Sequence, residues 1–462
     1  MPELQPLIVI NAVGLTRSLL PLAPRLQTLA QQHWLVNLEE VYPSVTCSAQ
    51  ATMLTGQPVH KHGVVGNGWL FRETQEIRFW NQSNRLIQSE PVYVTAQRRA
   101  QEKGYSFRCA KLFWWFNQGA QVAFSLTPKP HYGIDGSKVF GISGTPEGTA
   151  AACEKELGPF PFFTFWGPRA GLPCTQWIAK SAALLLERER PELTLVYLPH
   201  LDYDPQRFGP QGSDMAVLVQ ELDQACAPLF DAAHKIGARI WIISEYGHCQ
   251  VSRVVYLNRI LRANGLLKVR NGPFGEQLET FTSQAFAVCD HQLAHIYVAE
   301  RDLVPRVEEL LVHTPGVDRC FCGPDRATIH LDHPRSGEIV VLAQPDSWFA
   351  YPFWLDDRLA PDYARSVAIH HKPGYDPCEL LIDPSIRFPF LKVASKLLQK
   401  KLGLRFTMDL IPLEAELIKG SHGVPAQDPA HQPILIGTGP VPSSKSLPMQ
   451  AFRNLLLDAI FN

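Results

Sequence analysis

The sequence predicts an α/β protein built around a mostly parallel β-sheet. Three short runs rich in Val, Ile and Leu stand out, at residues 7–11, 193–198 and 238–244. Each run is too short for a helix and too uniformly apolar for a strand with one solvent-exposed face. Each therefore suits a strand that is buried on both faces. Segments with apolar residues at three- and four-residue spacing, at 177–189 and 213–236, lead into the second and third runs. Strand and helix in alternation is typical of a doubly wound sheet.

Composition and charge narrow the class of protein. The chain has 462 residues, with 43 Lys and Arg against 44 Asp and Glu, and 45% of its residues are apolar. Proteins that bind nucleic-acid polymers or lipid surfaces usually carry a sustained excess of Lys and Arg, so the near-zero net charge argues against both. No apolar run approaches the roughly 20 residues of a membrane span, so we expect no membrane-spanning helix.

The cysteines and the first residues indicate a cytoplasmic protein. Ten cysteines are spread singly along the chain without a disulfide framework, which is typical of reduced thiols. The first five residues carry an acid and no base, and the apolar stretch at 7–10 is too short for a signal peptide. We therefore expect cytoplasmic localisation.

Two stretches differ in character from the sheet-forming segments and are interpreted as insertions. Residues 66–173 hold many aromatic residues and turn signals, and residues 325–419 are dense in Pro, Trp and Asp. Both are expected to cover the rim of the sheet, the first in part as a cap and the second entirely so. The remaining segments, 1–65, 174–324 and 420–462, are predicted to form the core.

Oxygen-rich polar residues follow each of the three apolar runs. Asn11 ends the first run, Asp202 and Asp204 follow the second, and Glu245 and Tyr246 follow the third. Open α/β sheets bind their ligands at the carboxyl ends of the strands. We therefore expect the functional site where these side chains meet.

A hydroxyl group marks the start of a predicted helix after the first run. Pro43 keeps the approach extended, and residues 48–55 are expected to form a short helix that ends at Gly56. The simplest interpretation of Thr46 or Ser48 is a helix N-cap. The functional interpretation is a nucleophile, because a helix N-terminus favours negative charge and nearby acids could hold an activating metal.

The order of these motifs resembles the alkaline phosphatase superfamily, nearest its nucleotide pyrophosphatase/phosphodiesterase and phosphonoacetate hydrolase branches. The likeness starts with Tyr-Pro-Ser-Val-Thr at residues 42–46 and the helix that follows, and it returns in the family's order at 197–210, 243–247 and 420–423. The resemblance implies a three-layer α/β sandwich around a mostly parallel sheet, with inserted cap segments. Any one motif is weak, but four in the correct order are together fairly specific.

The resemblance also implies a function, that of a metal-dependent phosphoric ester hydrolase acting through a threonyl-phosphate intermediate on a small phosphorylated substrate. Thr46 falls on the family's nucleophile. In that family two metal ions, usually zinc, clamp the attacking and leaving oxygens. The residues that match the metal-ligand positions are Asp202, His422, Glu245, Asn11, Gln206 and Tyr246.

Four of these six positions depart from the family's residue types. Asn11 and Glu245 stand where the family has aspartate, and Gln206 and Tyr246 stand where it has histidine. The shift from imidazole towards oxygen favours Mg²⁺, Mn²⁺ or Ca²⁺ over zinc. The interpretations left open are a phosphoesterase with one metal or harder metals, a degenerate relative that binds a ligand or partner without hydrolysis, and a transferase that uses an acceptor other than water.

Several nearby side chains could replace the missing ligands. His200 and Asp204 flank Asp202 at two-residue spacing, and His248 lies two residues beyond Tyr246. Alternate side chains of an extended segment share a face, so they could point at one ion. The ordinary interpretation is a polar loop residue that bonds to the backbone.

Candidate substrate-binding residues lie in three places. The resemblance implies a polar residue that holds a phosphoryl oxygen three positions after the nucleophile, where this chain has Ala49. Gln50, beside it, could take that role. His371 and Lys372 lie on a Pro-Gly turn that could close over a substrate, although an ordinary surface turn accounts for it equally well. Trp115 belongs to a Phe-Trp-Trp-Phe motif that is more often core than a base-stacking platform.

A basic run at residues 392–405 contains an apolar helical stripe. Charge runs of this kind usually form the solvated face of a helix. We therefore expect residues 392–405 to form a helix whose charged side chains face solvent.

Overall fold

The computed structural model describes residues 4–134, 138–404 and 406–462. At its centre is a nine-stranded sheet with the order β23-β2-β22-β11-β1-β10-β5-β6-β9. Only β22 and β9 run against the other strands, so the sheet is mostly parallel, as predicted. Its strands are β1 (Leu7–Ala12), β2 (Trp34–Glu39), β5 (Cys109–Leu112), β6 (Phe124–Pro128), β9 (Ile142–Thr145), β10 (Leu193–Leu198), β11 (Arg239–Ile243), β22 (Ile434–Gly437) and β23 (Ser446–Pro448).

The three apolar runs form the middle of this sheet. β1 lies between β10 and β11, with Leu7 paired to Leu193 on one side and to Arg239 on the other. Every residue of β1 and β10 is buried, which is the environment that their continuous apolar character predicts. The carboxyl ends of the three strands therefore meet at one edge of the sheet.

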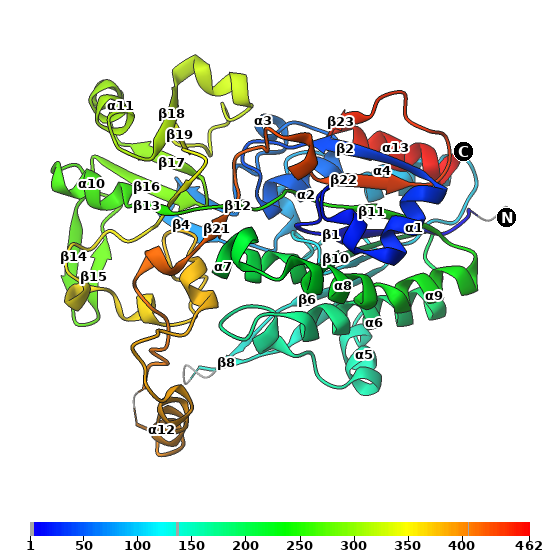
Figure 1. The fold of residues 1–462 in the computed structure, drawn as a ribbon, viewed down its shortest axis with the longest axis horizontal. Coiled ribbons are helices and arrows are strands. Elements are labelled where there is room, and N and C mark those ends of the chain that lie inside the picture. Colours follow the sequence, from blue (N-terminus) through cyan, green and yellow to red (C-terminus); the bar gives the residue numbers. More distant parts are fainter. Residues whose placement is uncertain (1–3, 135–137, 405) are drawn as a thin grey trace.

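Helices cover both faces of the sheet, giving the predicted three layers (Figure 1). One group packs together on one face, and it consists of α1 (Pro24–Gln32), α5 (Thr149–Leu157), α6 (Leu172–Glu189), α8 (Met215–Ala225) and α9 (Ala227–Ile236). The other group consists of α2 (Thr46–Thr55), α4 (Val92–Glu102) and α13 (Ala451–Phe461). The prediction of a single helix over 213–236 is wrong. The segment forms two helices that meet at Cys226, because Pro228 in the first turn of α9 has no N–H to donate to a carbonyl of the preceding turn.

A smaller antiparallel sheet lies beside the central one, at the left of Figure 1. Its order is β16-β17-β19-β18, formed by Ala285–Asp290, Leu293–Val298, Ile339–Ala343 and Val317–Cys322. Both predicted insertions contribute to the sheets, because residues 66–173 supply β5, β6 and β9 and residues 325–419 supply β19. The division into core and insertions stays a prediction.

The remaining regular elements are short hairpins, strand pairs and helices. The paired strands are β3 (Gly68–Phe71) with β4 (Glu76–Phe79), β7 (His131–Tyr132) with β8 (Lys138–Val139), β12 (Cys249–Gln250) with β21 (Gly420–Ser421), β13 (Arg253–Val255) with β20 (Ser347–Phe349), and β14 (Val269–Gly272) with β15 (Gly275–Leu278). The helices are α3 (Val59–His62), α7 (Asp204–Gly212), α10 (Leu257–Ala263), α11 (Val304–Val312) and α12 (Pro389–Lys401). Among the helices of the described segments, none combines the length and the apolar character that crossing a bilayer demands.

The basic run forms α12, but the interpretation of its charges as a solvated face is wrong in part. Lys392 and Lys396 turn towards the chain and pair with Asp409. The apolar stripe faces solvent instead, and no residue of α12 is buried. Arg405, the last residue of the run, lies outside the described residues.

Acid should weaken the fold through His62, a fully buried residue of α3. Its Nδ1 accepts a hydrogen bond from the Val64 N–H, so protonation of that atom would cost this bond. Burial lowers the pKa of His62 to about 3. Below pH 6.5 the unfolded chain takes up this proton and the folded chain does not, so stability falls as the pH drops towards 3. The slope from this one group approaches about 1.4 kcal/mol per pH unit in the middle of that window.

Urea denaturation at several pH values between 4 and 6.5 measures this effect. Replacing His62 by Gln should remove that contribution to the slope, although it also lowers stability at neutral pH. His234→Gln, at an exposed histidine of α9, is the matched control. An H62Q variant with the parent's full pH dependence would contradict the assignment.

Candidate active site

Thr46 is the first residue of α2, and its hydroxyl does not cap the helix. The N-cap is Val45, and no side chain makes a capping hydrogen bond there. The Thr46 Oγ1 atom lies 2.8 Å from the hydroxyl oxygen of Tyr246, and the Ser48 hydroxyl donates to the carbonyl of Val64. The N-cap interpretation of these two hydroxyls is therefore wrong, and Thr46 is available for another role.

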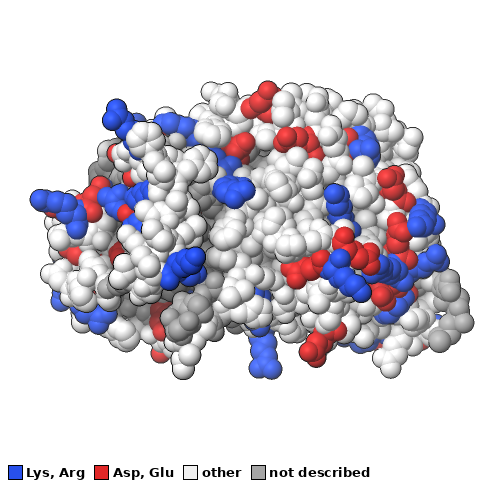
Figure 2. All heavy atoms as spheres, turned by 90° about the horizontal axis from the view of Figure 1, so that it is seen from below, with Lys and Arg blue, Asp and Glu red and all other residues white. Residues whose placement is uncertain are grey.

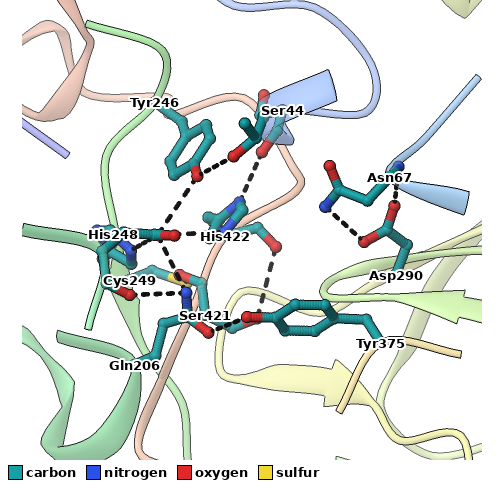
Figure 3. Close-up of polar contacts among 12 residues, drawn as sticks. Ser44, Asn67, Gln206, Tyr246, His248, Cys249, Asp290, Tyr375, Ser421 and His422 are labelled. Carbon is teal, nitrogen blue, oxygen red and sulfur yellow. Dashed lines mark hydrogen bonds and ion pairs between the residues drawn. The ribbon is translucent and has the colours of Figure 1, made fainter. Parts of the chain in front are cut away.

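Three potential metal ligands from separate segments meet beside this hydroxyl. Asp202 lies in the turn after β10, His248 in the loop after β11, and His422 directly after β21. Asp202 Oδ1 lies 3.0 Å from Nε2 of His248 and 3.8 Å from Nε2 of His422. One ligand atom from each residue lies within 4.8 Å of the other two. Figure 3 shows His248 and His422 close together beneath Tyr246.

Tyr246 connects the hydroxyl of Thr46 to this cluster. Its hydroxyl donates to Asp202 Oδ1 over 3.3 Å and also bonds with Thr46. Its ring stacks on the imidazole of His422 with centroids 3.8 Å apart. Burial raises the pKa of Tyr246 well above the ordinary value, so the phenol keeps its proton. Thr46, Tyr246 and Asp202 thus form one hydrogen-bonded chain.

His422 has the geometry of a metal-ligating imidazole. Its Nδ1 lies 2.7 Å from the carbonyl oxygen of Ser44 and donates to it, so Nε2 carries the lone pair. That Nε2 atom is buried without a hydrogen-bond partner. Burial lowers the pKa of His422 well below its usual value. A neutral imidazole oriented through its second nitrogen is the form that binds metals.

Gln206 hydrogen-bonds to Asp202 and has no amide atom left to bind a metal ion. Its amide nitrogen donates to the backbone carbonyl of Asp202 over 2.8 Å and to Oδ1 over 3.0 Å. Its amide oxygen accepts a hydrogen bond of 2.6 Å from the hydroxyl of Tyr375. Both ends of the amide are therefore occupied. His248, from a different loop, supplies the second imidazole beside Asp202.

His291 and Tyr375 complete the wall around His422. The ring of His291 lies 3.7 Å from His422 and 3.8 Å from Tyr375, centroid to centroid. Both residues are buried, and Tyr375 comes from the turn of the second predicted insertion. The sequence did not predict either residue as part of the site, because nothing in the local pattern shows that a residue distant in sequence will pack against His422.

His200 and Asp204 are engaged elsewhere. His200 Nε2 lies 2.9 Å from a carboxylate oxygen of Glu221, and Asp204 pairs with Arg207 at 2.6 Å. Of the side chains weighed as replacement ligands, only His248 belongs to the three-residue cluster. Its position two residues beyond Tyr246 was the available signal.

Asn11, Glu245 and Tyr246 match the remaining metal-ligand positions that the resemblance implies, and Glu245 receives hydrogen bonds from neutral amides. The side-chain nitrogens of Asn11 and Gln50 both donate to Glu245 Oε1, over 2.5 and 2.7 Å. Burial raises the pKa of Glu245 to about 8 despite these bonds, which favours the protonated carboxyl near neutral pH. Asn11 Oδ1 and Glu245 Oε2 are buried without hydrogen-bond partners. An amide, a neutral acid and the phenol of Tyr246 do not suit Zn²⁺, which prefers imidazole and thiolate donors.

Gln50 joins this position to the aromatic motif. Its side-chain oxygen accepts a hydrogen bond of 2.8 Å from the backbone N–H of Trp115. Phe113, Trp114 and Phe116 are buried in the core, whereas Trp115 is half-buried and packs on Trp80 with centroids 4.8 Å apart. Trp115 is therefore the member of the motif with surface left for a ligand.

The two basic candidates on the second insertion differ from each other. His371 is exposed. Lys372 is buried and pairs with Asp376 at 2.6 Å and with Glu379 at 2.9 Å, so its charge is already balanced. The same turn reaches the cluster through Tyr375. The substrate-binding roles of His371 and Lys372 stay predictions.

The mostly parallel sheet with helices on both faces is an alkaline-phosphatase-like fold. The chain belongs to the type I phosphodiesterase / nucleotide pyrophosphatase family, whose model matches residues 7–376. Among solved structures it is similar to phosphonoacetate hydrolase from Sinorhizobium meliloti in complex with phosphonoformate, at 15% identity and a TM-score of 0.59, covering 99% of this chain and 96% of that one. It is also similar to murine ectonucleotide pyrophosphatase/phosphodiesterase 5, at 14% identity and a TM-score of 0.57, covering 99% and 95%.

Two curated relatives match part of the chain. One is an uncharacterized pyrophosphatase/phosphodiesterase of Schizosaccharomyces pombe, 22% identical over 265 residues, which are 54% of this chain and 46% of the relative. The other is human ectonucleotide pyrophosphatase/phosphodiesterase family member 1, 22% identical over 248 residues, or 51% of this chain and 22% of the relative. The matched part therefore spans less than half of either relative.

Proposed function

We propose that the protein hydrolyses a phosphoric ester or phosphonate bond in a small phosphorylated substrate, with Thr46 as the nucleophile. The observation that carries this proposal is the convergence of the Thr46 hydroxyl with a cluster of metal-binding side chains. Tyr246 lies 2.8 Å from Thr46 and donates to Asp202, which is within reach of His248 and His422. Membership of a phosphodiesterase family supports the same chemistry.

One divalent metal ion would be held by Asp202, His248 and His422. Two imidazoles and one carboxylate suit zinc, with an open position for substrate, and they also accept Mn²⁺. The sequence expectation of a harder ion depended on losing imidazole at Gln206 and Tyr246, and His248 restores one imidazole at this position. When bound, the ion supplies a Lewis acid that polarises the phosphoryl oxygen.

The residues of this chain would carry both halves of the reaction. First, Thr46 Oγ1 bonds to phosphorus while the bond from phosphorus to the leaving oxygen breaks, and that oxygen keeps the electron pair. The hydroxyl proton moves along its hydrogen bond to Tyr246 as the phenol passes its own proton to the Asp202 carboxylate. A water oxygen then bonds to phosphorus and releases one proton to solvent, while the bond from phosphorus to Thr46 Oγ1 breaks and that oxygen, which keeps the electron pair, takes its proton back through Tyr246. The intermediate is a threonyl phosphate.

A catalytically degenerate relative is the second candidate function. The neutral donors at Asn11, Glu245 and Tyr246 favour it, because the family's usual pair of zinc ions activates both reacting oxygens. Such a protein would bind a phosphorylated ligand at the same cluster without turning it over.

Metal removal and replacement distinguishes the two candidates. Hydrolysis of an aryl phosphodiester should cease after dialysis against a chelator and return on addition of Zn²⁺ or Mn²⁺. Retention of full turnover after metal removal would contradict the enzyme proposal. Metal-loaded protein that turns over neither an aryl phosphodiester, a nucleoside triphosphate nor a phosphonate would favour the degenerate relative.

A cytoplasmic location is also part of the proposal. All ten cysteines are free, and seven of them are buried. Unpaired thiols in this number are typical of a reducing compartment. Fractionation of the native host cell, with the protein followed by antibody, is the direct measurement.

A further inference from the structure

Helix α12 presents its apolar face to solvent. Phe390, Leu397 and Leu398 recur at helical spacing and so lie on one face. These three residues are 89, 52 and 57% exposed. Leu391 extends the same face, and Phe388 precedes the helix, both also exposed. Figure 1 shows α12 standing away from the body of the molecule at its lower edge.

The opposite face of α12 attaches to the chain through charges. Lys392 Nζ lies 3.0 Å from one carboxylate oxygen of Asp409, and Lys396 Nζ lies 2.7 Å from the other. Lys392 also donates to the backbone carbonyl of Asp409 over 2.6 Å. The helix is therefore held by its polar face, the reverse of a helix that packs its apolar stripe on the core.

Positive charge borders the exposed apolar face. Residues 385–404 contain five cationic side chains and no acidic one. Three of the five, Arg387, Lys400 and Lys401, are exposed. Figure 2 views the molecule from the side towards which α12 projects, and the left half of that face shows basic side chains with some acidic ones among them. An apolar face bordered by cations is complementary to an anionic, apolar surface.

We propose that α12 docks on an anionic lipid surface, with its Phe and Leu side chains entering the interface and its cations contacting the headgroups. A second copy of the chain is the less favourable occupant, since two α12 helices face to face would bring like charges together without an acidic partner on the helix. The near-zero net charge of the whole chain does not argue against local docking, because it averages over distant surfaces. This proposal does not depend on the hydrolytic function.

Vesicle co-sedimentation of the full chain tests the proposal. The protein should bind vesicles of phosphatidylcholine with about 30 mol% phosphatidylserine at least about tenfold more tightly than vesicles of phosphatidylcholine alone. About 0.5 M salt should weaken that binding by screening the lysines. Equal binding to the two kinds of vesicle, or binding to neither, would overturn the proposal.

Two double variants assign the binding to α12. Leu397→Gln with Leu398→Gln should lower the affinity for the anionic vesicles at least about tenfold, as should Lys400→Glu with Lys401→Glu. Val217→Gln with Phe281→Gln removes exposed apolar side chains elsewhere and should bind like the parent. An α12 variant with unchanged binding would overturn the proposal. So would a parent dimer in sedimentation velocity that dissociates in L397Q/L398Q, because it would assign the face to a second copy.

Discussion

Replacing Thr46 by Ala should lower kcat for an aryl phosphodiester at least about 10³-fold, because the variant lacks the oxygen that would form the covalent intermediate. Metal content should stay at the parent's level, since the ligands Asp202, His248 and His422 are intact. Thr46→Ser should retain part of the activity, because it keeps a hydroxyl at the same position. Steady-state kinetics on the metal-loaded proteins gives kcat for the parent, T46A and T46S.

Ser48→Ala is the matched control for the loss of one hydroxyl from α2. Ser48 lies two residues from Thr46 but donates to the carbonyl of Val64, so its loss should affect stability more than turnover. Undiminished turnover in T46A, with S48A equally active, would contradict the nucleophile assignment. Trapping of radiolabelled phosphate on the parent, absent in T46A, would identify the threonyl phosphate directly.

Replacing His422 by Ala should abolish both metal binding and turnover. The Nε2 lone pair of His422 is buried and unpartnered, and its loss removes one of three ligands. We expect the metal affinity to fall by more than about 100-fold, beyond the effect of changing a residue that merely supports a ligand. His248→Ala should have the same consequence. Metal affinity is measured by competition with a chromogenic chelator.

His234→Ala, at an exposed histidine of α9, is the control for removing an imidazole. Gln206→Ala should lower the metal affinity less than H248A, because Gln206 only holds Asp202 in place through two hydrogen bonds. The reverse order, with Q206A more severe than H248A, would show that the ligand assignment of these two residues is wrong.

The central sheet was predictable because its middle strands are buried on both faces. β1, β10 and β11 are nearly continuous apolar runs, and runs of that length between helical segments are typical of the inner strands of a parallel sheet. The division of 213–236 into two helices was less visible, since Pro228 is also tolerated in the first turn of a helix. The smaller sheet depends on pairing between distant strands such as β17 and β19, which leaves no local signal.

The candidate site was predictable where residue type and motif order agreed. Asp202 and His422 lie together near Thr46, as the resemblance implied. The sequence offered His248 as one of several replacement ligands, but that its ring lies beside Asp202, while Gln206 only bonds to Asp202, depends on which loop reaches Asp202 in space. Likewise, the pKa of Glu245 is raised by burial against the hydrogen bonds from Gln50 and Asn11, which lower it, and burial of a polar residue at a strand end cannot be read from sequence spacing.

The number and position of bound metal ions test the central claim most directly. Elemental analysis of the purified chain, combined with anomalous diffraction at the zinc edge, should give one ion per chain, placed among Asp202, His248 and His422. Two ions, with the second beside Asn11 and Glu245, would contradict the single-metal site. No ion after saturation with Zn²⁺ and Mn²⁺, or an ion bound away from these three residues, would contradict the metal centre itself.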